Sequence, residues 1–179
     1  MTVPAEPAGA SLEAVRAAVA AIADPEVPVL TIEDLGVLRS VDREAGRIVV
    51  TITPTYSGCP AMQHIEQEVV RVLSEAEAGG EVRTVLSPAW TTDWLTEAGR
   101  RKLRAYGIAP PSGLAAHASP GGAGARAEAG VAVAIRQPVP CPQCGSTSTE
   151  VVSEFGSTAC KALYRCRDCR EPFDYFKEL

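Results

Sequence analysis

Residues 47–73, R-I-V-V-T-I-T-P-T-Y-S-G-C-P-A-M-Q-H-I-E-Q-E-V-V-R-V-L, contain the pattern that decides the fold. The first seven residues are rich in β-branched side chains, which predicts a strand over residues 47–53. From residue 61 the apolar residues recur with a period of about 3.6, which predicts a helix that ends near residue 78. The turn between strand and helix places one cysteine, Cys59, directly before a proline.

The flanking sequence predicts more elements of both kinds. Ser11 can cap a helix that ends at Asp24-Pro25, because proline cannot continue a helix. A hairpin turn at Gly46 joins the first strand to another, and Gly107 ends a helix that Thr91 or Thr92 begins. These further strands are expected at residues 36–42 and 81–86. The pattern predicts a compact α+β domain with a short mixed sheet.

Composition divides the chain into four parts. Residues 1–10 are small and proline-rich, and we expect a disordered tail. Residues 11–109 form the α+β domain. Residues 110–130 are almost wholly Ala, Gly, Pro and Ser, which is typical of a flexible linker. Residues 131–179 hold five of the six cysteines and are expected to form a separate small unit.

Charge and hydropathy exclude several classes of protein. The net charge of −5 disfavours a general nucleic-acid binder, which needs a basic surface. The chain has no apolar run of about 18 residues, so we expect no membrane span. Its first residues lack the basic and apolar regions of a signal peptide. We expect a cytoplasmic protein whose cysteines are reduced and serve as metal ligands or reactive thiols.

Four cysteines in the last part form two C-x-x-C pairs, Cys141 with Cys144 and Cys166 with Cys169. Each pair can form a knuckle, and four thiolates can surround one Zn²⁺ in a closed tetrahedron. Because so short a segment buries little surface, a metal would supply folding free energy. We predict a structural zinc ribbon, while an iron centre in the same cage and two separate redox pairs are the alternatives.

Other features of the ribbon leave two questions open. Residues 141–179 contain five basic and six acidic residues, a balance that disfavours phosphate binding, so contact with a protein is the better hypothesis. Phe173, Tyr175 and Phe176 either anchor that contact or fill the ribbon's own core. Cys160 lies outside both pairs beside Lys161, which can lower the pKa of a thiol. It is either a buried inert thiol or an additional functional thiol or metal ligand.

Cys59 precedes Pro60, a residue suited to the first position of a helix. The unpaired N–H groups at a helix start favour a thiolate, and Gly58 permits unusual backbone angles. His64 lies one turn into the helix, where a solvent-facing role is the simplest, and His117 lies in the linker. A Cys–His hydrolase is therefore disfavoured. A transient metal or cluster ligand fits better, and a partly buried small residue is the alternative.

Acidic residues precede this region in D-P-E-V-P-V-L-T-I-E-D-L-G, residues 24–36. Together with T-P-T-Y-S-G-C-P-A-M, this stretch resembles the small iron–sulfur assembly domain of SufT-like proteins. The resemblance implies a compact α+β fold and assigns cluster or iron handling to Asp24, Glu26 and Cys59. Without it, Asp24 and Glu26 indicate only a turn after the first helix.

Three further stretches, P-A-W-T-T-D-W (88–94), F-G-S-T-A-C-K-A-L-Y-R-C (155–166) and E-P-F-D-Y-F-K (171–177), narrow the match. They resemble the PaaD family, also called PaaJ, of bacterial phenylacetyl-CoA ring-1,2-epoxidase systems. The resemblance implies a non-catalytic accessory subunit in aerobic phenylacetate breakdown that matures a metal centre in a partner subunit. A purely structural subunit is the alternative.

Overall fold

The computed structural model describes residues 10–76, 79–111 and 138–178. The chain divides into two compact units, Met1–Lys102 and Leu103–Leu179, which are described one at a time. Nearly all of the expected tail and linker lies outside the described residues, as does His117. In this division residues 103–109 group with the second unit.

The first unit is built on a sheet of three strands, β1 (Leu38–Glu44), β2 (Arg47–Ile52) and β3 (Gly80–Thr84), in the order β1-β2-β3. β1 and β2 form the predicted antiparallel hairpin, and Gly46 in its turn has φ +83°. β2 and β3 run parallel, which requires a crossover connection. The sheet is therefore mixed, as the sequence predicted.

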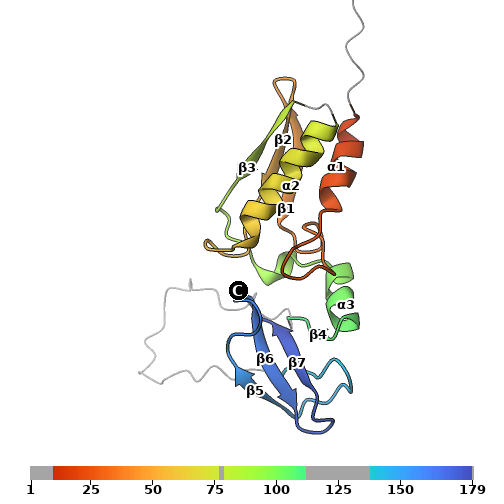
Figure 1. Cartoon of the computed structure of the whole chain (residues 1–179), viewed down its shortest axis with the longest axis vertical. Helices are drawn as coiled ribbons and strands as arrows, with labels where there is room; N and C mark the ends of the chain where they lie inside the picture. The colour runs from red at the N-terminus through yellow and green to blue at the C-terminus, as the bar shows by residue number, and fades with distance from the viewer. Residues whose placement is uncertain (1–9, 77–78, 112–137, 179) are drawn as a thin grey trace, which may run out of the picture. The chain divides into compact units, whose positions relative to one another are not determined.

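Two helices pack on this sheet (Figure 1), α1 (Leu12–Ala20) against β1 and α2 (Ala61–Glu75) against β3. The hydroxyl of Ser11 accepts a hydrogen bond from the backbone N–H of Ala14 at 3.2 Å, which confirms the predicted cap of α1. α2 is the crossover between β2 and β3. The turn that holds Cys59 thus lies at the carboxyl end of β2, where open parallel sheets place their sites.

The helix predicted from Thr91 or Thr92 is interrupted. A short 3₁₀ helix, η1 (Thr92–Trp94), is followed by Leu95 in an extended conformation and then by α3 (Glu97–Ala105). The residue that caps α3 is Thr96, whose hydroxyl accepts a hydrogen bond from the N–H of Gly99 at 3.0 Å. The prediction of the cap was wrong because the choice of Thr96 over Thr91 and Thr92 depends on contacts of Thr96 with Asp34, which the local sequence does not reveal.

The second unit contains a four-stranded sheet in the order β4-β7-β6-β5. Its strands are β4 (Ile108–Ala109), β5 (Thr149–Ser153), β6 (Lys161–Cys166) and β7 (Pro172–Phe176). β5 and β6 form the hairpin that was expected between the two cysteine pairs. β4 pairs in parallel with β7, which explains why Ile108 and Ala109 belong to this unit.

The aromatic residues of β7 are largely buried. Phe173 is 4% exposed and Phe176 is 2% exposed, while Tyr175 is half-buried. Phe173 is a core residue of this unit, and Tyr175 packs against the same cluster. The large apolar side chains that the described part of this unit exposes are Tyr106, Val151, Val152 and Phe155.

Candidate metal sites

The four cysteines of the two C-x-x-C pairs meet at one end of the second unit. Cys141 and Cys144 lie on a knuckle before β5, where Gly145 has φ +74°. Cys166 ends β6, and the second knuckle continues to Cys169. The N–H of Gly145 bonds to the carbonyl of Cys141 at 2.9 Å, which closes the first knuckle as the sequence predicted.

The two knuckles place their sulfurs at the spacing that a metal requires. The Sγ atoms of Cys141 and Cys169 are 3.7 Å apart, and those of Cys144 and Cys166 are 3.6 Å apart. All four sulfurs lie within 4.8 Å of one another. A tetrahedral Zn²⁺ with Zn–S distances of about 2.3 Å separates its sulfurs by about 3.8 Å. The donor set and its spacing therefore fit zinc.

Backbone N–H groups prepare one of these sulfurs for a metal. The N–H groups of Cys169 and Asp168 point at Cys166 and lower the pKa of its thiol to about 7. A thiolate is the form that binds metal, so the knuckle favours the ligand state. Cys141 and Cys166 are buried, whereas Cys144 and Cys169 are exposed.

Cys160 does not belong to this cluster. Its sulfur is buried and lies 3.0 Å from the hydroxyl of Thr158. The ammonium of the neighbouring Lys161 is directed to Asp174, at 3.3 Å. The structure therefore agrees with the hypothesis of a buried thiol and leaves the four-cysteine set closed.

Cys59 lies in the turn that precedes α2. Its N–H bonds to the carbonyl of Tyr56 at 3.1 Å, and its own carbonyl accepts from Met62 at 3.3 Å. Pro60 is the residue that caps α2 and lies just before its first turn. Gly58 does not have a positive φ, so the prediction of unusual backbone angles at this residue was wrong.

The environment of the Cys59 thiol disfavours the thiolate, contrary to the prediction from helix position. Burial raises the pKa of this thiol, and the negative charges of Glu26 and Asp24 raise it further. The N–H of Ala61 and the side chain of Thr55 act in the opposite direction without reversing the shift. The helix start does contribute, but burial and two nearby carboxylates outweigh it.

Asp24 and Glu26 lie close enough to Cys59 for their charges to raise the pKa of its thiol. Asp24 is buried, and its Oδ1 accepts hydrogen bonds from the N–H groups of Glu26 and Val27, both at 2.8 Å. This carboxylate therefore also fixes the turn after α1. In the described part of the chain, only the four ribbon cysteines bring three or more ligand atoms close together. The Cys59 site is consequently open and incomplete.

A polar group near this site escaped the sequence interpretation. The hydroxyl of Thr53, directly after β2, is buried and has no hydrogen-bond partner among the described residues. Such a group is unfavourable unless something bonds to it. Its position at the end of a strand, six residues before Cys59, was the only available signal.

His64, by contrast, is an exposed residue of α2 and lines a groove between this helix and α1. It has the solvent-facing position that was expected. His64 therefore does not serve as a general base for Cys59, and the arrangement does not favour a thiol hydrolase.

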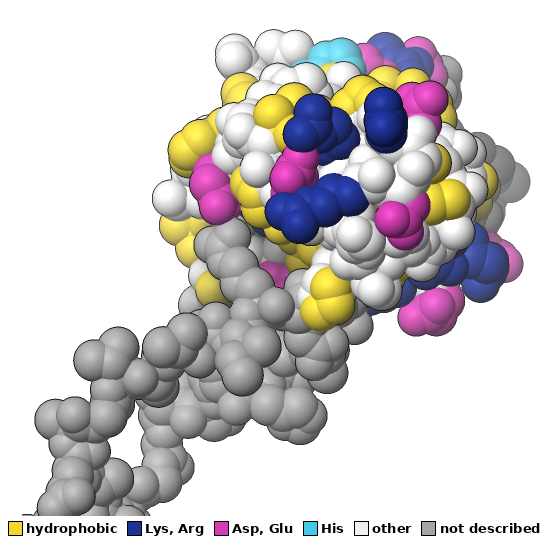
Figure 2. Space-filling model, turned by 90° about the horizontal axis from the view of Figure 1, so that it is seen from below, with side chains coloured by type: hydrophobic (Ala, Val, Ile, Leu, Met, Phe, Trp, Pro, Cys, Tyr) yellow, Lys and Arg dark blue, Asp and Glu magenta, His cyan; other side chains and the backbone are white. Residues whose placement is uncertain are grey.

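The surface charge of the molecule is mixed. Figure 2 shows a face on which Lys and Arg side chains alternate with Asp and Glu and with apolar groups. In the second unit, Arg165 and Arg167 both pair with Glu150. Paired cations of this kind do not form the basic surface that nucleic acids need. No helix in the described part of the chain is long and apolar enough to cross a membrane.

Two parts of the chain match the models of known protein families. Residues 12–87 match the model of the iron–sulfur cluster assembly protein family, and residues 127–177 match that of the PaaD zinc beta ribbon domain. A putative 1,2-phenylacetyl-CoA epoxidase subunit of Escherichia coli (strain K12) is 48% identical over 157 residues, 87% of this chain and 86% of that protein. The chain belongs to the PaaD family.

Further relatives match part of this PaaD chain. The Fe-S protein maturation auxiliary factor of Porphyromonas gingivalis (strain ATCC BAA-308 / W83) is 34% identical over 77 residues, 41% of this chain and 72% of that protein. A domain of unknown function, DUF59, from Bacillus anthracis aligns with 28% identity and a TM-score of 0.47, covering 51% of this chain and 89% of that one. A conserved hypothetical protein from Thermotoga maritima aligns with 22% identity and a TM-score of 0.45, covering 53% of this chain and 95% of that one.

Proposed function

We propose that this PaaD chain is an accessory subunit of the phenylacetyl-CoA epoxidase system of aerobic phenylacetate breakdown. Its role is to mature or insert an iron–sulfur or iron centre in another subunit. The observation that carries this proposal is the meeting of Cys59 with Asp24 and Glu26 at the carboxyl end of β2. The likeness of this unit to iron–sulfur assembly proteins supports the same conclusion.

An incomplete ligand set suits temporary binding. Iron–sulfur clusters are held by four protein ligands, usually cysteines, whereas the first unit offers one thiol. The remaining ligands must then come from the donor or from the client, which makes transfer possible. Cys59 must also lose its proton when iron binds, so its raised pKa makes binding weaker and more easily reversed.

The ribbon serves this function as a folded unit and not as a second active centre. Cys141, Cys144, Cys166 and Cys169 would hold one Zn²⁺, which supplies folding free energy and leaves no position for substrate. We infer a non-catalytic protein in the cytoplasm, where its thiols stay reduced. Its partners are the other epoxidase subunits, and nucleic acid and membranes are not among them.

One observation favours a second candidate, a purely structural subunit that stabilises the oxygenase complex. Val151, Val152 and Phe155 expose between 42% and 69% of their surface, and exposed apolar side chains of this kind suit a protein contact. In that case Cys59 is only a half-buried residue, and its replacement has no effect on metal content.

The two candidates are separated by co-producing the chain with the other epoxidase subunits under anaerobic conditions. Cys59→Ala should leave the complex assembled but lower the iron content of the purified client subunits, because the transfer ligand is missing. Cys160→Ala is the matched control, since it removes another non-cluster thiol of the same chain. Fully metallated, active complex from Cys59→Ala would overturn the proposal in favour of the structural subunit.

A further inference from the structure

We propose that Asp34 is a positioning residue, which holds the loop of Asp24 and Glu26 in place beside Cys59 through a clamp to Lys102 and Thr96 of the α3 segment. This inference rests on the proposed function for its purpose, although the geometry and its test do not require iron. Asp34 lies in the same acidic loop but has a different environment from the two acids near the thiol.

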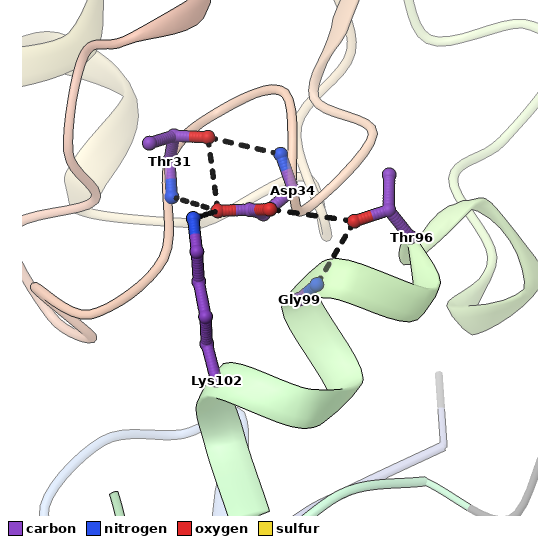
Figure 3. Close-up of polar contacts among 5 residues, drawn as sticks. All are labelled: Thr31, Asp34, Thr96, Gly99 and Lys102. Carbon is purple, nitrogen blue, oxygen red and sulfur yellow. Dashed lines mark hydrogen bonds and ion pairs between the residues drawn. The ribbon is translucent and has the colours of Figure 1, made fainter. Parts of the chain in front are cut away.

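The Asp34 carboxylate is saturated by partners from two segments of the first unit (Figure 3). Its Oδ2 accepts from the ammonium of Lys102 at 2.5 Å and from the N–H and hydroxyl of Thr31 at 3.0 and 3.1 Å. Its Oδ1 accepts from the hydroxyl of Thr96 at 3.4 Å. A carboxylate with this many donors has little capacity left for a metal, so its role is to connect.

The backbone of the loop is tied to the same segment. The N–H of Thr96 bonds to the carbonyl of Asp34 at 2.8 Å, and the indole of Trp90 donates to the carbonyl of Leu35 at 2.8 Å. A Cβ at Gly99 would lie 3.0 Å from the carbonyl oxygen of Asp34, so helix and loop are in close contact. The clamp therefore consists of a half-buried ion pair with backbone hydrogen bonds beside it.

A short series of contacts leads from the clamp to the acidic pair. Thr31, which bonds to the Asp34 carboxylate, forms an isolated β-bridge with Ala23, next to Asp24. The N–H of Asp24 bonds to the carbonyl of Leu30 at 2.9 Å. The residues on both sides of the loop are thereby fixed to each other, and a shift at Asp34 has a direct route to Asp24.

The ion pair differs from an ordinary surface pair. The side chain of Asp34 is 8% exposed, while that of Lys102 is 44% exposed. Burial by itself would raise the pKa of Asp34, but the hydrogen bonds from Lys102 and Thr31 outweigh it and hold the pKa below its usual value. The carboxylate thus stays ionised and depends on its donors, as a buried charge must.

The pH profile of alkylation at Cys59 provides the test, with peptide mapping of the full-length, zinc-loaded chain. Asp24 and Glu26 raise the pKa of this thiol, so a displaced loop lowers the midpoint of the profile. We expect Asp34→Asn and Lys102→Gln to increase the alkylation rate at pH 7 about threefold, equivalent to a fall of about half a pH unit. Lys102→Arg should keep the wild-type midpoint because it keeps the charge.

Two controls separate positioning from loss of stability. Glu44→Gln breaks the pair of Glu44 with Arg83, an ion pair of the same unit outside the loop, and should leave the profile unchanged. Glu26→Gln should lower the midpoint itself, and adding Asp34→Asn to it should lower the midpoint by less than Asp34→Asn does in the wild type. That non-additivity shows that Asp34 acts through the acidic loop.

The proposal is overturned if folded Asp34→Asn or Lys102→Gln keeps the wild-type midpoint while its melting temperature falls. If Asp34→Asn does not fold, Lys102→Gln decides, because its side chain is largely at the surface. The outcome is independent of the proposed function. A shifted profile together with a harmless Cys59→Ala would keep the clamp and reject iron handling, and the reverse pair of results would reject the clamp alone.

Discussion

The ribbon cysteines and Cys59 are thiols of one chain in opposite situations. Four ribbon sulfurs lie within 4.8 Å of one another on two knuckles, and backbone N–H groups lower the pKa of Cys166 to about 7. Cys59 has no second thiol beside it in the described part of the chain, and burial and two carboxylates raise its pKa. A closed set of four sulfurs suits a resident metal, and a single thiol with a raised pKa suits a passing one.

The difference also concerns what holds each site in shape. The ribbon sheet is small, and its core includes the ligands Cys141 and Cys166 themselves. The Cys59 site is placed by the β2–α2 connection, and the acidic loop is held by the hydrogen bonds of Asp34. The ribbon should therefore unfold when its metal is lost. The Cys59 site should lose its geometry when the residues that position it are substituted.

The largest expected effect is loss of the ribbon metal. Cys166→Ser, or a strong chelator, should remove the zinc and unfold the second unit, since structural Zn²⁺ contributes about 10 kcal/mol or more in comparable small sites. Zinc analysis and hydrogen exchange of the full chain measure this, with the first unit staying protected. Cys160→Ser is the control and should retain one zinc per chain. A ribbon that stays protected from hydrogen exchange without metal would contradict the idea that it depends on metal more than the Cys59 site does.

The next largest effect concerns the backbone of the first unit, which holds Cys59. Gly36 has φ +68°, and a Cβ there would lie 2.5 Å from the carbonyl oxygen of Trp94. Gly36→Ala should therefore destabilise the first unit by about 3 kcal/mol, while zinc content stays unchanged. Urea unfolding measures the difference.

Gly46→Ala is the matched control for that substitution. Gly46 also has a positive φ, of +83°, but no atom lies within 4 Å of the added Cβ. Only backbone strain remains, which costs about 1 kcal/mol. Equal losses in the two variants would show that the contact between Gly36 and Trp94 contributes nothing.

Acid should weaken the first unit through Asp34. Its folded pKa lies below the usual value of 3.8, so its contribution is complete above that pH and is lost as the pH falls through the folded pKa. Asp34→Asn should cost about 2 kcal/mol at pH 7, because hydrogen bonds to a charged group are replaced by weaker ones. The difference in unfolding free energy between the wild type and Asp34→Asn should be smaller at pH 3 than at pH 7. An equal difference at both pH values would contradict this assignment.

The sequence predicted most of the fold because its signals are local. The β-branched residues of 47–53, the Ser11 cap and Gly46 are local signals, and the structure has the strand, the capped helix and the hairpin. β4 was missed because a two-residue strand has no periodicity and forms only through pairing with β7. The start of α3 was misplaced because the choice of Thr96 depends on contacts with Asp34.

The two sites also differ in how much of their chemistry the local sequence reveals. The spacing of the four cysteines alone indicated the cluster, and the structure brings those sulfurs together. For Cys59, helix position predicted a lowered pKa, whereas the sign depends on burial and on two carboxylates more than thirty residues earlier. Asp34 gave no signal, because an acidic loop residue acquires its function only when Lys102 folds against it.

The smallest expected effect compares the two knuckles with each other. The residue after the second cysteine of each pair has a positive φ, +74° at Gly145 and +66° at Arg170. A side chain in this conformation costs about 1 kcal/mol relative to glycine, so the second knuckle carries strain that the first does not. Arg170→Gly should stabilise the zinc-loaded ribbon by up to about 1 kcal/mol in urea unfolding. Gly145→Ala should do the reverse, because nothing lies within 4 Å of its added Cβ and only the strain is introduced. If Arg170→Gly instead weakens the ribbon, the arginine side chain makes a contact that outweighs its backbone, and the two knuckles are not equivalent supports for the metal.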